Sequence, residues 1–390
     1  MRVLVASHTA RIGGGEHSLL TLLPALAPDV VPVIACPEGP LAEALRARGL
    51  EVVRTSGLEG GFALHPVHTP RAVGNLVKLA FGLRRAARRA DAALIHANSV
   101  RAGLAAVAAR SLGGPPAIVH VRDCLPAGPV GAAVRRAVAA ADCVIANSRY
   151  TAASFGAAPD RVRIVYPSID PDRFDPSAVD RDAARTCLGL APDDLALGVV
   201  AQLTPWKGQD LALRALARLR EEMPQARLLF VGEAKFVEAA VRYDNRAYER
   251  QLRELASEAG LAGAVSFLGE RHDMPEVLAA LDMQLAPSWE EPFGRAVVEG
   301  MAMGLPVIAT EIGGPAELID DGIDGLLLPP HDPVRWTAAV LELARAPERR
   351  AELGRRARRR ALEFTPQREA EAVLSAYGAA LRVPPARGRS

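Results

Sequence analysis

The sequence predicts an α/β protein built from two doubly wound domains, and three observations lead to this fold class. Short apolar runs rich in β-branched residues alternate with helical patterns, which is typical of parallel sheets built from right-handed βαβ units. Several runs are apolar at nearly every position, as expected of strands that helices cover on both faces. A stretch rich in proline and aspartate interrupts the alternation near its middle, which indicates a boundary between two domains.

Seven strands are predicted in the first half of the chain, at residues 3–7, 31–35, 52–55, 93–97, 118–121, 143–147 and 162–166. Helical patterns separate them at residues 16–26, 41–48, 71–89 and 101–110. We therefore predict a first domain over residues 1–168 and a linker over residues 169–184.

The alternation resumes in the second half, with strands predicted at residues 197–203, 227–231, 264–268, 283–286, 306–310 and 325–328. We predict a second domain over residues 185–365. A last helical pattern, at residues 367–382, has an apolar stripe but no strand after it, so we predict a crossover helix and tail over residues 366–390.

Composition and charge exclude several classes of protein. Hydrophobic residues make up 49% of the 390 residues and charged residues 24%, which allows a large core and argues against disorder. No apolar run approaches the roughly 20 residues needed to span a bilayer, and the N-terminus lacks a signal-peptide pattern. We expect a cytoplasmic protein. The 47 basic and 45 acidic residues leave a net charge of +2, which does not indicate a nucleic-acid partner.

The cysteines and histidines show no pattern of disulfides or metal ligands. Cys36, Cys124, Cys143 and Cys187 form no Cys-x-x-Cys pair, and we interpret them as reduced, buried thiols. The histidines lack the spacing of zinc ligands, so we predict no metal.

The strongest functional signal is APSWEEPFGRAVVEGMAMGLPVIATEIGGPAELIDDG, over residues 286–322. A predicted helix begins near Phe293 and Gly294, where backbone N–H groups and the helix dipole favour an anion. Glu291 and Glu299 can accept hydrogen bonds from sugar hydroxyls. Alone, each glutamate is better explained as a solvated or dipole-complementing carboxylate. Together these features suit a ligand with phosphates between two hydroxylated rings, which is the shape of a nucleotide-sugar.

This stretch resembles PSxxExFGxxxxEGMAxGxPVIAT…GGxxExIxDGxxG, the C-terminal signature of the retaining family-4 glycosyltransferases, which have the GT-B fold. GGGE at residues 13–16 is similar to the family's N-terminal Gly-Gly-x-Glu loop, and LTPWKG at residues 203–208 to its Lys-Gly loop. VRIVYPSIDPDRFDP is similar to its linker. The resemblance covers nearly the whole chain. It implies two facing Rossmann-like domains, of which the first, residues 1–168, is on the acceptor side, and a C-terminal helix that returns to the first domain.

The resemblance also implies an activity, namely transfer of a sugar from a nucleoside-diphosphate-sugar to an acceptor hydroxyl with retention of configuration. The sugar nucleotide would be a co-substrate, with no cofactor and no metal. The acceptor could be a glycan, a lipid-linked molecule or a small molecule. Two alternatives stay open: an epimerase or phosphorylase of the same fold, and a non-catalytic binder of nucleotide-sugars.

Roles for the matching residues follow from the resemblance. Glu299 would hold the ribose hydroxyls and Glu291 those of the transferred sugar, while the Phe293 and Gly294 amides would reach the sugar and the diphosphate. Lys207 would neutralise the leaving diphosphate, which agrees with the rule that a preorganised cation lowers the barrier where negative charge develops. Lysine is rare in this chain, with 3 among 47 basic residues, and this favours a functional role over a surface one.

Glycines in three loops complete the predicted donor site. Gly13, Gly14 and Gly15 follow the first strand, where missing side chains let a phosphate or sugar approach the backbone. Gly232 and the turn that contains Arg271 are similar to places where the family encloses the nucleobase and phosphates.

Two departures from the family pattern affect predicted site residues. Gln202 stands where relatives often have an arginine, so one counterion of the diphosphate is missing, and Arg271 or an arginine of the first domain could replace it. Arg122 stands where many relatives have a histidine beside the transferred sugar, and it could contact sugar or diphosphate. Asp123 could orient Arg122 or the acceptor hydroxyl. We interpret His96 as a half-buried structural histidine of the preceding strand.

One basic helix offers two interpretations. From Arg71 to Arg89 it has apolar positions at Val73, Leu76, Val77, Ala80 and Leu83, with four arginines near its end. It could make weak contact with anionic lipid at the inner face of a membrane. We favour the other interpretation, an amphipathic helix on the sheet with cations at its C-terminus.

Overall fold

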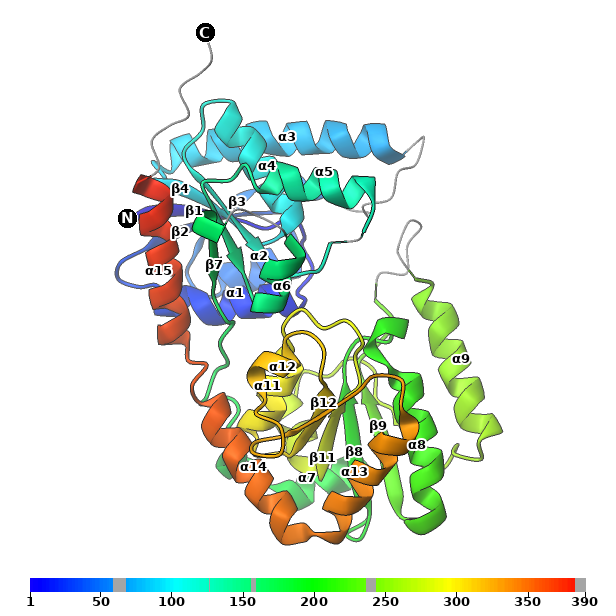
Figure 1. The fold of residues 1–390 in the computed structure, drawn as a ribbon. Coiled ribbons are helices and arrows are strands. Elements are labelled where there is room, and N and C mark those ends of the chain that lie inside the picture. Colours follow the sequence, from blue (N-terminus) through cyan, green and yellow to red (C-terminus); the bar gives the residue numbers. More distant parts are fainter. Residues whose placement is uncertain (59–67, 126, 156–158, 236–242, 383–390) are drawn as a thin grey trace. The chain divides into compact units, whose positions relative to one another are not determined.

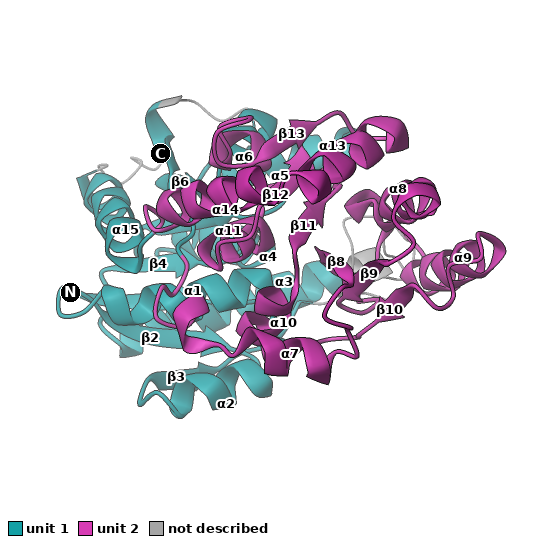
Figure 2. Ribbon diagram, turned by 90° about the horizontal axis from the view of Figure 1, so that it is seen from below, with its two compact units in different colours: residues 1–168, 365–390 teal, residues 169–364 magenta. Residues whose placement is uncertain are grey.

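A computed structural model describes residues 1–58, 68–125, 127–155, 159–235 and 243–382, except for the side chains of residues 68–71 and 159 (Figure 1). The chain divides into two compact units, one of residues 1–168 and 365–390 and the other of residues 169–364 (Figure 2). Each described unit contains a parallel sheet with helices packed against it, as the alternating pattern predicts.

The sheet of the first unit has the strand order β3-β2-β1-β4-β5-β6-β7. Its strands are β1 Arg2–Ala6, β2 Val31–Cys36, β3 Glu51–Arg54, β4 Leu94–Ala97, β5 Ala117–Val121, β6 Cys143–Ala146 and β7 Val162–Ile164. Chain order reverses on either side of β1, because Val5 pairs with Ile34 of β2 on one side and with His96 of β4 on the other. In open α/β sheets such a reversal creates a crevice at the carboxyl ends of the strands, where ligands bind.

Helices cover both faces of this sheet. They are α1 Gly14–Ala25, α2 Pro40–Arg46, α3 His68–Arg89, α4 Val100–Ser111, α5 Pro129–Val138, α6 Arg149–Phe155 and α15 Pro366–Arg382, with a short 3₁₀ helix η1 at Pro159–Arg161. Val5 of β1 belongs to the core formed with α1, α2 and α15, whereas its neighbour Leu4 belongs to the core formed with α3 and α4. This alternation explains why the strand is apolar throughout.

The C-terminal helix α15 belongs to the first unit, as the resemblance implies. Val373 and Tyr377 are buried in the core on the α1 face of the sheet. The Glu369 carboxylate accepts hydrogen bonds from the backbone N–H and the hydroxyl of Ser168, at 2.9 and 2.6 Å. Hydrogen bonds between residues more than 200 positions apart therefore attach α15 to the rest of the first unit.

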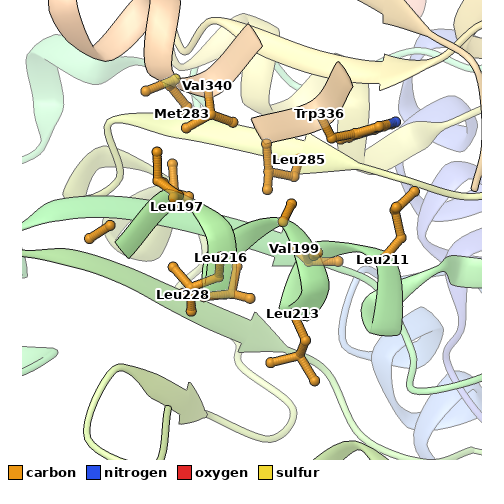
Figure 3. Close-up of a cluster of buried hydrophobic side chains, with 14 of the residues drawn as sticks. Leu197, Val199, Leu211, Leu213, Leu216, Leu228, Met283, Leu285, Trp336 and Val340 are labelled. Atoms are coloured by element: carbon orange, nitrogen blue, oxygen red, sulfur yellow. The ribbon is translucent and has the colours of Figure 1, made fainter. Parts of the chain in front are cut away.

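The sheet of the second unit has the order β10-β9-β8-β11-β12-β13. Its strands are β8 Leu195–Val200, β9 Ala226–Val231, β10 Val265–Phe267, β11 Met283–Ala286, β12 Val307–Thr310 and β13 Leu326–Leu328. Its helices are α7 Arg181–Cys187, α8 Gln209–Glu222, α9 Asn245–Glu258, α10 Met274–Ala280, α11 Arg295–Ala302, α12 Pro315–Leu318, α13 Pro333–Arg345 and α14 Pro347–Ala361, with 3₁₀ helices η2 Pro176–Ala178 and η3 Pro205–Lys207. Figure 3 shows its core, where Leu197 and Val199 of β8 lie with Leu285 of β11 and Trp336 of α13.

Residues 169–184, predicted as a linker, lie within the second unit. They contain η2 and the beginning of α7, where the Asp180 side chain accepts the N–H of Ala183 at 3.0 Å. The buried Arg185 of α7 donates to the carbonyl oxygens of Ala280 and Asp194, at 3.0 and 2.7 Å. Buried hydrogen bonds therefore fix this segment to the second sheet, and the sequence pattern did not reveal them.

The prediction that all four cysteines are buried is right for two of them and wrong for the other two. Cys36 and Cys143 are buried, and burial raises the pKa of each thiol to about 11. Cys124 is half-buried, and Cys187, at the last position of α7, is exposed. All four are free thiols.

Candidate functional site

Lys207 and Glu291 form an ion pair at the carboxyl ends of two neighbouring strands. Lys207 ends η3, which follows β8, and Glu291 lies in the loop after β11, the parallel neighbour of β8. The Lys207 ammonium donates to Glu291 Oε2, and each side chain is only 14% exposed. The ammonium also lies 4.1 Å from the centroid of the Trp206 ring, a cation–π contact. The structure therefore brings together the predicted diphosphate ligand and the predicted sugar ligand.

The two loops that carry this pair are packed backbone to backbone. The N–H of Trp289 donates to the carbonyl of Trp206 at 3.0 Å, and its indole N–H donates to the carbonyl of Pro205 at 2.8 Å. Gly208 has a φ of +69°, and a Cβ there would lie 2.2 Å from the carbonyl oxygen of Pro287. Only glycine fits both the conformation and the space at this position.

A pair of glycines after β12 supports the loop that carries Glu291. The N–H of Gly314 donates to the carbonyl of Glu291 at 2.8 Å. A Cβ would lie 2.2 Å from the Glu291 carbonyl oxygen at Gly313 and 2.0 Å from the Phe293 carbonyl oxygen at Gly314. Gly294, the N-cap residue directly before α11, has a φ of +100°. These short backbone distances explain why the motif has two glycines at this point: the loop before α11 packs against Gly313 and Gly314 and leaves no room for side chains there.

Glu299 lies in the second turn of α11 and is 9% exposed. Its carboxylate accepts a hydrogen bond from Arg295 Nε at 2.7 Å. Gly300 faces the buried Gln284 of β11, whose side-chain amide donates to the carbonyl of Ala296 at 2.9 Å. A Cβ at Gly300 would lie 1.6 Å from Gln284 Oε1. The helix with Glu299 is thus fixed closely against the central strand.

The remaining predicted donor residues lie at the ends of β8, β9 and β10. Gln202 accepts, through its backbone carbonyl, a hydrogen bond of 2.8 Å from the side chain of Gln209. Gly232 has a φ of +135°, and its N–H donates to the carbonyl of Gly269 at 2.8 Å. Arg271 donates from Nε to Asp273 at 2.8 Å, and this ion pair raises the pKa of Arg271.

In the first unit, the glycine loop (Gly13, Gly14 and Gly15) is hydrogen-bonded to the carboxylate of Glu16. Glu16 accepts the N–H of Gly13 at 3.2 Å and the hydroxyl of Ser7 at 3.5 Å, and only 8% of it is exposed. Burial raises the pKa of Glu16, while the hydrogen bond from Gly13 and the charge of Arg122 oppose this shift. A Cβ at Gly15 would lie 3.1 Å from Arg122 Cδ. The loop and Arg122 are therefore direct neighbours.

Arg122 lies at the centre of a polar cluster at the carboxyl ends of β4, β5 and β6. Its Nε and Nη2 donate to Asn98 Oδ1 at 3.2 and 2.9 Å, and Nη2 also donates to His120 Nδ1 at 3.2 Å. Asn98 in turn donates to the carbonyl of Gly15 at 3.2 Å. Asn147, after β6, donates to the carbonyl of Arg122 at 3.3 Å. The guanidinium therefore has a fixed orientation beside the glycine loop.

His96 is fully buried rather than half-buried, with 1% of it exposed. Its Nδ1 lies 2.7 Å from the hydroxyl of Tyr377 in a hydrogen bond, and its ring stacks on that of His120 with centroids 5.6 Å apart. Burial first, and the charge of Arg122 second, lower the pKa of His96 to about 3 and that of His120 well below its ordinary value. Both imidazoles are neutral near pH 7.

A second polar group, which the sequence pattern did not reveal, adjoins this cluster. Ser99 Oγ lies 2.8 Å from His8 Nδ1, and Arg101 donates to His8 Nε2 at 3.5 Å. Burial, with Arg101, lowers the pKa of His8 to about 4. The charge of Asp123 opposes the effect of burial on the pKa of Arg101. The available signal was positional, because His8 and Ser99 each lie within two residues of the end of a predicted strand.

Within the part of the chain that the structure describes, no group of three or more His, Cys, Asp or Glu side chains could hold a metal ion. Among the same residues, no helix combines the length and the apolar character that crossing a bilayer requires.

Two family models match this chain, and together they cover most of it. "Glycosyl transferases group 1" matches residues 180–360, and "Glycosyltransferase Family 4" matches residues 12–173. Two curated relatives are D-inositol 3-phosphate glycosyltransferases, from Stackebrandtia nassauensis (38% identical over 255 residues, 63% of this chain and 56% of that one) and from Saccharomonospora viridis (36% identical over 250 residues, 63% and 57%). The chain thus spans a little over half the length of these relatives.

Solved structures resemble the chain over nearly its whole length. HepE of Anabaena, in complex with UDP and glucose, has a TM-score of 0.83 and 25% sequence identity, and covers 96% of this chain and 99% of its own. Sucrose-phosphate synthase of Thermosynechococcus elongatus has a TM-score of 0.78 and 22% identity, and covers 97% and 98%. The second likeness concerns the fold alone.

Proposed function

We propose an activity for this chain on the premise that it belongs to the glycosyltransferases of group 1 and family 4. Its fold is the predicted GT-B fold, as the likeness to solved structures shows. The proposed activity is transfer of a sugar from a nucleoside-diphosphate-sugar to an acceptor hydroxyl, with retention of configuration at the sugar carbon.

The Lys207–Glu291 ion pair carries this proposal. It places a cation and a carboxylate together at the carboxyl ends of β8 and β11, directly before the N-terminus of α11. Lys207 would approach the diphosphate, together with the amides that begin the helix. Glu291 would accept hydrogen bonds from the sugar hydroxyls, and Glu299, in the second turn of the helix, from the ribose. The carboxylate also fixes the ammonium, so little reorganisation is needed when negative charge develops.

The proposed reaction needs no nucleophile from the protein. The acceptor oxygen attacks the anomeric carbon on the face from which the diphosphate leaves, forming one C–O bond as the other breaks. The acceptor proton moves to the departing phosphate oxygen. Lys207 and the α11 amides stabilise the diphosphate that leaves, which is where the negative charge grows. The side chains thus orient and stabilise, and the leaving group itself acts as the base.

In the first unit, Arg122 is proposed to contact the sugar or the diphosphate. Its hydrogen bonds to Asn98 and His120 fix the guanidinium beside Gly15. Asp123 is close enough to influence the pKa of both Glu16 and Arg101, and is proposed to orient the acceptor hydroxyl.

Relatives suggest which substrates to test first. HepE binds UDP, and one of its structures contains UDP-glucose, so we propose a UDP-sugar as donor. The curated relatives are named for transfer to D-inositol 3-phosphate, so a phosphorylated cyclitol is the first acceptor to test. We propose that the reaction takes place in the cytoplasm, at or near a membrane surface.

A thermal-shift panel of UDP-, GDP-, ADP- and TDP-sugars tests the donor class. Specific stabilisation by the UDP-sugars is expected, because a ligand that binds only the folded state raises its stability by mass action. Product analysis by NMR with and without acceptor then separates the activities. Retained configuration in an acceptor-dependent product supports transfer, whereas an acceptor-independent epimer or a phosphate-dependent sugar phosphate would contradict it.

A further inference from the structure

Helix α3 carries three large apolar side chains exposed to solvent along one line. Val73, Val77 and Phe81 are 55%, 48% and 51% exposed, and their spacing of four residues places them on one face of the helix. Leu83 and Ala87, on the opposite face, are buried in the core against the sheet. The interpretation favoured from the sequence, an amphipathic helix packed on the sheet, would bury the apolar positions, but Val73 and Val77 are exposed. We call Val73, Val77 and Phe81 the apolar ridge.

Basic side chains continue and flank the apolar ridge. Arg84 and Arg88 follow Phe81 by three and seven residues and so lie on the same side of the helix, while Arg85 and Arg89 lie beside them. No aspartate or glutamate occurs between residues 68 and 89. Among the described residues, none of these four arginines forms an ion pair with a carboxylate.

The arginines of the second basic helix, α14, differ from those of α3 because several of them form ion pairs with carboxylates. Arg355 and Arg356 both pair with Glu352, at 2.6 Å, and Arg360 pairs with Glu363 at 2.8 Å. Carboxylates of the helix and its end thus neutralise part of the α14 charge. On α3 the positive charge is concentrated beside exposed apolar surface, a combination typical of helices that lie in a membrane interface.

A cavity of about 880 Å³ between α3 and the edge strand β3 adds to this surface. Arg54, Lys78, Arg85 and Arg89 line it, together with the hydroxyl-bearing residues Thr55 and Ser56. The carboxylate among its lining residues, Glu51, is paired with Arg2 at 3.2 Å. The cavity therefore presents cations and hydroxyls to a phosphate group next to the apolar ridge.

We propose that this face of α3 docks on the surface of an anionic lipid bilayer. The apolar ridge enters the boundary between headgroups and acyl chains, and the flanking cations contact lipid phosphates. Arginine and lysine suit this position because their apolar stems can lie along lipid while the charged ends reach the headgroups.

Two other occupants agree less well with the same observations. A second copy of the chain would bring its own four arginines against these four, and like charges oppose such a pairing. A nucleic acid would match the cations but would leave the apolar ridge in water. An anionic bilayer satisfies both the charge and the apolar surface.

Sedimentation of the full chain with vesicles tests the proposal. The chain is expected to pellet with vesicles of equal parts phosphatidylglycerol and phosphatidylcholine, and not with phosphatidylcholine alone. The substitutions V73S/V77S/F81S and R84Q/R85Q/R88Q each remove one part of the surface. Loss of three cations lowers partitioning by roughly a hundredfold, given the attraction of each basic residue to an anionic surface. Salt weakens binding of the wild type and, to a smaller extent, of the arginine variant.

The matched control is R355Q/R356Q, which removes two arginines from α14 and is expected to bind vesicles like the wild type. The altered side chains are at least partly exposed, and unchanged thermal melting of each variant checks that it is folded. Equal binding to neutral and anionic vesicles would overturn the proposal, and so would unchanged binding by both α3 variants. Self-association or RNA binding that depends on these residues, without binding to vesicles, would also overturn it. Sugar transfer is not measured, so the outcome is independent of the proposed enzyme activity.

Discussion

The hydroxyl of Tyr377 and Nδ1 of His96 lie 2.7 Å apart, although 281 residues separate them in sequence. Tyr377 lies on the last helix, α15, and His96 on the central strand β4. The His96 ring stacks on His120, which accepts a hydrogen bond from Arg122. The C-terminal helix is therefore connected through two neutral, buried imidazoles to a proposed site residue.

Replacing Tyr377 with phenylalanine tests this connection. The Tyr377→Phe variant keeps the ring in the core but leaves His96 Nδ1 buried without its partner. We expect the free energy of unfolding to fall by about 1–3 kcal/mol, the cost of leaving a buried polar group unsatisfied. Chemical denaturation of both proteins measures this difference. Equal stability would show that the hydrogen bond makes no net contribution.

Gly300 and Gln284 allow a test of packing by compensation. A Cβ at Gly300 would overlap Gln284 Oε1, so Gly300→Ala is expected to destabilise the chain by about 1–3 kcal/mol or more. In a Gly300→Ala, Gln284→Ala double variant the methyl group has room. The double variant should therefore lose less stability than the sum of the losses of the two single variants. Gly74→Ala is the control, because nothing lies within 4 Å of a Cβ there. Simple additivity in a double-mutant cycle would argue against this contact.

The lowered pKa values of His8 and His96 predict that the chain loses stability in mild acid. Their pKa values in the folded chain, about 4 and about 3, lie below the ordinary value of 6.5. Between pH 6.5 and these lower values, the unfolded chain therefore binds more protons than the folded chain. Stability therefore falls as the pH drops below 6.5. Each histidine should contribute about 2 kcal/mol of loss between pH 7 and pH 5.

Denaturation of the wild type and of His8→Gln at both pH values isolates one of these histidines. The variant should lose less stability on acidification than the wild type does. Glu16 acts in the opposite direction because its pKa is raised, but it is present in both proteins. The same pH dependence in both would contradict the assignment of a neutral, buried His8.

The two glutamates are expected to affect donor binding differently. Glu299→Gln should weaken binding of UDP about 10- to 100-fold, since a charged acceptor at the ribose hydroxyls contributes about 1.5–3 kcal/mol. Glu291→Gln should leave UDP affinity unchanged or higher, because it frees Lys207 for the diphosphate, while weakening binding of UDP-glucose. Calorimetric titration with both ligands separates these effects. Weaker UDP binding by Glu291→Gln alone would reverse the proposed roles.

Much of the fold could be predicted from sequence because strands and helices alternate with local apolar patterns. The contact between Lys207 and Glu291 could not be predicted, because it depends on β8 and β11 being neighbours in the sheet, and the sequence pattern does not give the strand order. The Tyr377–His96 hydrogen bond could not be predicted, since it depends on where a helix packs from 281 residues away. On α3, helical periodicity indicated an apolar stripe but not which part of it the sheet covers.

Steady-state transfer by Lys207→Met tests the central claim most directly. With a UDP-sugar and an acceptor, the wild type should form a product of retained configuration, and kcat should fall about 10²- to 10³-fold in the variant, as on loss of a group that stabilises transition-state charge. Arg355→Met, which breaks the surface ion pair with Glu352, should retain wild-type kcat. Transfer by Lys207→Met at the wild-type rate would contradict the proposed role of Lys207.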